Sequence, residues 1–178
     1  MHYLTTPTPI TEELIQKLVV KYTNIFTSRF PELQLRVFRS WSGQPPIADV
    51  PEELRPTLPE TPMVSGLFFN IGTDYRIGIN RNYSIAGQLM TFFHEYGHAC
   101  YKREANEAID NTNALIRTET AALLSSLRLA DAEGLPDIAF LAVDAARTAA
   151  PMGTVYQKAM DSVQTDPLWI KYSQRPSA

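Results

Sequence analysis

The sequence predicts an α+β fold, in which a small sheet is followed by a mainly helical second half. Three short runs, 33–38, 66–71 and 75–79, are apolar or alternating in the way that strands are. From residue 84 onward, apolar side chains recur every three or four positions, which is typical of amphipathic helices. The chain has 178 residues, of which 44% are hydrophobic and 20% charged. We therefore expect a single globular domain over residues 1–178.

The first third of the chain predicts a helix, a strand and a long loop. Residues 11–28 carry apolar side chains at helical spacing, and Thr11 is placed to cap the helix N-terminus. Pro31 ends this pattern, and the strand expected at 33–38 follows. Residues 43–62 contain six prolines and little periodicity, so we expect a surface loop there rather than a linker between domains. Loops of this length often lie over functional sites.

A hairpin and a helix are expected next. Residues 72–74, which read Gly-Thr-Asp, provide turn chemistry between the strand-like runs 66–71 and 75–80. Ser84 is placed to cap the following helix, whose broad apolar face extends towards Tyr101.

The second half of the chain predicts further helices. One starts near residue 112 and ends at about residue 132, because Gly134 and Pro136 follow it. Two more are expected at 139–150 and 154–163, and a short final segment begins at Asp166.

Composition excludes several classes of function. Nineteen acidic and 16 basic residues give a formal net charge of -3, which argues against non-specific nucleic-acid binding. Cys100 is the only cysteine, so neither an intrachain disulfide nor a Cys-rich zinc site is expected. We expect a cytoplasmic protein without a membrane span, because the sequence shows no secretory signal and no run of about 20 apolar residues.

The motif that carries chemistry lies inside the helix expected from Ser84. Residues 92–98 read Phe-Phe-His-Glu-Tyr-Gly-His, so His94 and His98 lie one turn apart on one helical face and both reach a single metal ion. Zinc suits this set, because a catalytic zinc site uses three nitrogen or oxygen ligands and a water. Glu95 is placed to take a proton from that water. The alternative is a pair of half-exposed histidines beside a solvated glutamate.

A third ligand has to come from elsewhere in the chain. We favour Glu119, because it shares a helical face with leucines, and a buried carboxylate needs a partner such as a cation. Glu104 is the rival, six residues after His98, within a run that reads as continuing helix. Asp110 is a weaker candidate or an acceptor for a ligand histidine, and His2 is the remaining histidine.

Small residues surround the proposed ligands. Gly97 inside a helix costs about 1 kcal/mol relative to alanine, which indicates that something packs closely against its backbone. The helix of Glu119 is also rich in small residues, at 121, 122, 125 and 126, which allows the two helices to approach closely.

Other reactive side chains are less informative. Cys100 lies two positions after His98 and is interpreted as a core thiol. Tyr156, Tyr101 and Tyr83 each carry a hydroxyl that is able to stabilise a developing oxyanion, and the sequence does not select among them.

Residues 75–130 resemble the ImmA/IrrE-type zinc metallopeptidases, which are small zincins. The resemblance rests on a strand ending in Asn, a helix of the form F-x-x-A-H-E-x-G-H and a following E-x-x-A helix. The matching positions are Asn80, His94, Glu95, Gly97, His98, Glu119 and Ala122. The chain departs from the pattern at Phe93, where a small residue is usual. The motif is also similar to the F-H-E-F-G-H of larger oligopeptidases.

The resemblance implies a zincin-like fold in which His94, His98 and Glu119 bind Zn²⁺ and Glu95 is the general base. Family members cleave protein substrates, in known cases transcriptional repressors. We therefore expect a metallopeptidase that acts on a protein or peptide, with the substrate extended along the strand at 76–80. The alternative is a catalytically silent zinc-binding interaction or sensor protein on the same scaffold. An intact Glu95 favours the enzyme, because a structural zinc needs no base.

Overall fold

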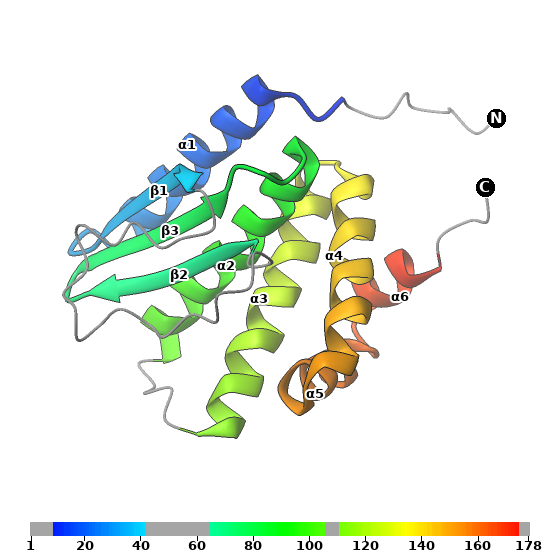
Figure 1. Ribbon diagram of the computed structural model, residues 1–178. Coiled ribbons are helices and arrows are strands. Elements are labelled where there is room, and N and C mark those ends of the chain that lie inside the picture. The colour runs from blue at the N-terminus through cyan, green and yellow to red at the C-terminus, as the bar shows by residue number, and fades with distance from the viewer. Residues whose placement is uncertain (1–8, 42–64, 106–110, 175–178) are drawn as a thin grey trace.

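A three-stranded mixed sheet and the helices beside it give the α+β fold that the sequence predicts (Figure 1). The structure is a computed structural model that describes residues 9–41, 65–105 and 111–174. The expected proline-rich loop at 43–62 lies outside these residues. In Figure 1, α2 runs between the sheet on one side and α3 on the other, and it packs against both.

The N-terminal helix and strand form where the sequence predicts them. Helix α1 covers Glu12–Arg29 and is capped by Thr11, whose Oγ1 accepts a hydrogen bond from the backbone N–H of Leu14 at 3.2 Å. Strand β1 covers Gln34–Trp41 and ends three residues after its alternating run. The extension follows from pairing, since Trp41 is still in register with Asn80 of β3 after an irregularity.

The sheet has the order β1-β3-β2, so its central strand is the last in sequence. Strands β2 (Gly66–Ile71) and β3 (Asp74–Asn80) form the expected antiparallel hairpin. Its turn contains Gly72 at φ +58°, a conformation that favours glycine. Strand β1 pairs with β3 in parallel. Both long edges of β3 are therefore occupied by neighbouring strands.

Helix α2 (Ile85–Ala105) holds the predicted motif, and Ser84 caps it as expected by accepting the N–H of Gly87 at 3.1 Å. The apolar face of α2 is buried against the sheet and α1. Tyr22 of α1 meets the rings of Phe93 and Tyr96 edge-on, with ring centroids 5.8 and 5.5 Å apart. This packing fixes the helix that carries both histidines.

The second half of the chain is helical, as predicted. Its elements are α3 (Thr112–Ala132), α4 (Pro136–Ala149), the 3-10 turn η3 (Ala150–Met152), α5 (Thr154–Val163) and α6 (Pro167–Ser173). Helix α3 ends before Gly134, which has φ +66°. Helix α4 starts three residues earlier than expected, because Pro136 occupies a first-turn position where its missing N–H costs nothing.

Among the described residues, no helix combines the length and apolar character that crossing a bilayer requires.

Candidate metal centre

Three predicted ligands from two helices meet in the structure. His94 and His98 come from α2, and their rings lie edge to face with centroids 4.8 Å apart. Glu119 comes from α3, which packs beside α2. The Nε2 atoms of the two histidines lie 3.2 Å apart, and the carboxylate oxygens of Glu119 lie 3.4 Å from His94 Nε2 and 3.6 Å from His98 Nε2. Within the described ranges this is the one group of His, Cys, Asp and Glu arranged to hold a metal ion.

The separations within this triad are compatible with a bound metal ion. Zinc bonds of about 2.0–2.1 Å at tetrahedral angles put ligand atoms about 3.3 Å apart. The two histidine Nε2 atoms, 3.2 Å apart, are close to that spacing. The 3.4 and 3.6 Å contacts reach two different oxygens of Glu119, and with one ligand atom from each residue all three atoms lie within 4.8 Å of one another. Two imidazoles and one carboxylate are also a donor set that zinc uses in catalytic sites. The chain therefore brings together three side chains that are able to hold a metal ion.

The close approach of the two helices depends on Gly97. A Cβ atom at Gly97 would lie 2.5 Å from the Cβ of Ser125 and 2.8 Å from the Cα of Ala122 on α3. Contacts that short do not occur, so only glycine allows α3 to lie where it does. The expectation that small residues bring the two helices together is confirmed, and this contact lies between the two elements that carry the ligands.

Glu95 is buried beside the triad and beneath strand β2. Its side chain packs against Gly66, where an added Cβ would lie 2.9 Å from Glu95 Cγ and 3.0 Å from its Oε1. Glu95 is 7% exposed, and burial raises the pKa of its carboxyl to about 7, while the charge of His94 and the backbone N–H of Phe68 act in the opposite direction. A carboxyl that titrates near neutrality is suited to accept and return a proton.

Burial and charge also shift the pKa values of the ligand residues. Burial lowers the pKa of His98 to about 4, so this imidazole is neutral at neutral pH. Burial also opposes the charged form of His94, but the hydrogen bond and charge of Glu119 and the charge of Glu95 outweigh it, and the pKa of His94 is raised. For Glu119, burial is outweighed by the two histidines and the pKa is lowered. The free site is thus a partly protonated His–Glu cluster.

Thr118 is a functional residue that the sequence analysis did not identify. Its hydroxyl oxygen lies 3.0 Å from Nδ1 of His98, and its side chain is buried at 4% exposure. No local pattern marks this residue, because the contact joins positions 20 apart on different helices. The one available signal is that Thr118 directly precedes the predicted ligand Glu119.

The other predicted ligands are not part of the triad. Glu104, the rival third ligand, forms an ion pair with Arg29 of α1 at 2.9 Å and lies half exposed. Asp110 and His2 fall outside the described residues. Cys100 packs against the hydrophobic core, and burial raises the pKa of its thiol to about 11, in agreement with a core thiol.

The prediction that substrate binds along β3 is wrong, because β3 is the central strand and both its edges are already paired. In the described part of the chain, the strand with an unpaired edge beside α2 is β2. Asn80 donates its N–H to the carbonyl of Ser65, so the backbone groups of Ser65 face β3. Since orientation alternates along a strand, the polar backbone groups of Gly66, Phe68 and Asn70 face the free edge.

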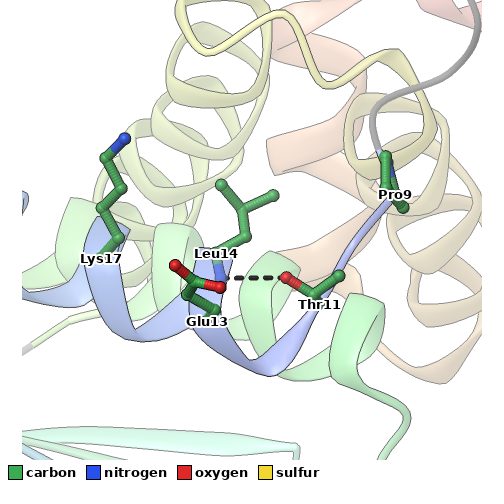
Figure 2. A pocket seen from close by; sticks show the side chains of 5 residues that line it. All are labelled: Pro9, Thr11, Glu13, Leu14 and Lys17. Atoms are coloured by element: carbon green, nitrogen blue, oxygen red, sulfur yellow. Dashed lines mark hydrogen bonds between the residues drawn. The ribbon is translucent and has the colours of Figure 1, made fainter.

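A shallow hollow of about 250 Å³ lies at the N-terminus of α1, away from this chemistry (Figure 2). It is lined by Pro9, Thr11, Glu13, Leu14 and Lys17, and Figure 2 shows Thr11 engaged in capping α1. None of these residues belongs to the metal triad or contacts it.

Comparisons with models of known protein families, with curated proteins and with solved structures give no match to this chain.

Proposed function

We propose that this protein is a zinc-dependent metallopeptidase with a zincin-like fold. The observation that carries the proposal is the pairing of a cluster of three possible metal ligands with a buried glutamate, Glu95, directly after the first of them. A site that only stabilises a fold uses four protein ligands, whereas three ligands and an adjacent base are the arrangement of catalytic zinc. The proposed family is the one whose motif the sequence resembles, the ImmA/IrrE-type peptidases.

In this proposal His94, His98 and Glu119 hold the metal. A bound zinc ion supplies Lewis-acid chemistry, lowering the pKa of water from about 15.7 towards about 7 and polarising a substrate carbonyl. Glu95 takes a proton from the attacking water as its oxygen forms a bond to the carbonyl carbon. Glu95 then returns that proton to the amine nitrogen when the C–N bond breaks. In the free protein the pKa of Glu95 is about 7, and a neighbouring cation would favour the carboxylate form that accepts the proton.

The proposed substrate is an extended segment of a protein or peptide that adds to the free edge of β2. The outward-facing backbone groups of Gly66 and Asn70 and the carbonyl of Phe68 offer it hydrogen bonds, while the N–H of Phe68 is directed to Glu95. Gly66 packs against Glu95, so a segment on this edge runs past the base. A structure with bound peptide lying away from β2 would overturn this placement.

The proposal is tested by Glu95→Gln, which removes the base and keeps the volume of the side chain. We expect the purified mutant to keep one equivalent of zinc and to lose hydrolysis of a peptide library by at least about 100-fold. The wild-type protein, measured alongside for metal content and turnover, is the control. A wild type that binds zinc and cleaves nothing would instead favour the silent zinc-binding protein. Loss of zinc from the mutant would remove Glu95 from the role of base.

A further inference from the structure

Tyr156 lies in the first turn of α5 on the face that packs against α3. Ala159 and Val163, three and seven positions later, share that face and are buried, at 3% and 0% exposure. Helix α3, which carries Glu119, is the helix that α5 contacts most extensively. The side chain of Tyr156 is therefore directed from α5 towards the ligand helix.

Unlike Ala159 and Val163, Tyr156 is not buried. Its side chain is 45% exposed, although it lies on the inward stripe of α5. Burial, together with the charges of Glu119 and Glu95, raises the pKa of its phenol. No hydrogen bond from the Tyr156 hydroxyl to another described residue is found. Tyr156 thus presents an accessible, protonated hydroxyl on the side of α5 that meets the helix of Glu119.

Tyr83 and Tyr101 are placed differently. Tyr83 precedes α2, where its carbonyl accepts the side-chain amide of Gln88 at 2.9 Å. It lies eleven residues before His94, which corresponds to about 16 Å along a helix axis. Tyr101 lies on α2 itself, three positions after His98, and so belongs to the helix of the histidines rather than to the opposite side of the site.

We infer that Tyr156 is a catalytic residue that donates a hydrogen bond to the substrate carbonyl oxygen as that oxygen gains negative charge. The inference rests on the proposed peptidase function and names a residue that faces the triad from α5. When water adds to the carbonyl carbon, the electron pair of the C=O bond moves to oxygen. Tyr156 stabilises that charge and keeps its own proton, while the proton taken from water stays on Glu95 until it passes to the leaving nitrogen.

The test uses zinc-loaded protein and N-phosphoryl-Leu-Trp, a dipeptide whose tetrahedral, anionic phosphoryl group imitates the charged oxygen. We expect Tyr156→Phe to weaken binding of this probe by about 10- to 100-fold in titration calorimetry, because a hydrogen bond to a charged group is lost. Zinc content and circular dichroism should match the wild type. Unmodified Leu-Trp, which lacks the phosphoryl group, should bind both proteins equally weakly. Tyr83→Phe is the matched control and should bind the probe as the wild type does.

In turnover, Tyr156→Phe should lower kcat by about 100-fold with little change in KM, as expected for a donor that acts in the transition state. The inference would be overturned if Tyr156→Phe bound the probe as tightly as the wild type does. It would also be overturned if Tyr83→Phe or Tyr101→Phe lost as much affinity, or if the wild type did not bind the probe. If the wild type binds the probe through Tyr156 but cleaves no peptide, the proposed peptidase function would be refuted. The hydrogen bond from Tyr156 to the anionic group would still be supported.

Discussion

The Nδ1 atom of His98 lies 3.0 Å from the hydroxyl oxygen of Thr118, and its Nε2 atom faces His94 and Glu119. A ligand nitrogen has to present a lone pair to a metal, so if His98 binds the proposed zinc through Nε2, its ring proton would reside on Nδ1 and be donated to Thr118. Thr118 thereby selects the tautomer and holds the ring plane. Because Thr118 precedes Glu119 on α3, one helical turn supplies both a ligand and the partner of another ligand.

Replacing Thr118 with valine should weaken zinc binding by about 10-fold, which is the lower range for loss of an outer partner of a ligand histidine. Valine keeps the shape of threonine and removes the acceptor, whereas Thr118→Ser keeps the hydroxyl and should restore most of the affinity. Competition with a chromogenic chelator measures both variants. Equal affinity in the valine and serine variants would show that the hydroxyl does not position His98.

The third ligand is tested by comparing Glu119→Ala with Glu104→Ala. Glu119→Ala should lose zinc on dialysis, since two neutral imidazoles alone form a weak site. Glu104 instead forms a half-exposed ion pair with Arg29, so Glu104→Ala should retain zinc and change stability by under about 1 kcal/mol. Metal analysis measures the zinc content of both variants, and circular dichroism checks that both are folded. Zinc retained by Glu119→Ala and lost by Glu104→Ala would reverse the ligand assignment.

Gly97→Ala should push α3 away from α2, because the added Cβ would come within 2.8 Å of the Ala122 backbone. Overpacking of this kind costs about 1–3 kcal/mol, which the higher helix propensity of alanine offsets by about 1 kcal/mol. Zinc affinity should fall together with stability, since the same displacement moves Glu119. Gly153→Ala is the matched control, because its Cβ would meet nothing closer than 3.9 Å. Equal melting temperatures and zinc affinities for the two variants would contradict this account.

Features contained within one segment were predictable from the sequence. His94 and His98 share a helix, so their four-residue spacing alone determines that both face one point. The Thr11 and Ser84 caps were predictable for the same reason, since each acts on the turn that follows it.

Features that depend on pairing between distant segments were not predictable in the same way. The central position of β3 results from its parallel pairing with β1, which lies more than 30 residues earlier. A run of alternating residues looks the same at the edge of a sheet and in its middle. The contact between Thr118 and His98 depends on the relative position of α2 and α3 along their axes, and sequence periodicity determines only which face each helix buries.

The last prediction concerns the protons that zinc displaces. Zinc binds only unprotonated ligands, and the pKa of His94 in the free protein is raised by Glu119 and Glu95 against the effect of burial. His94 therefore holds its proton to higher pH than a free imidazole does, whereas His98, with a pKa of about 4, is neutral at neutral pH. Zinc affinity should then fall as the pH drops through the pKa of His94, by up to about tenfold per pH unit for one displaced proton.

Glu95 adds to this release, because its pKa of about 7 leaves it partly protonated and a neighbouring cation favours the carboxylate. Calorimetry in two buffers of different ionisation enthalpy should show net proton release on zinc binding between about pH 6 and pH 7, decreasing at about pH 8. In Glu95→Gln the release should be smaller and still present, because His94 remains protonated. In that variant, release that is absent across this range would mean that His94 is already neutral and that Glu119 does not hold a proton on it.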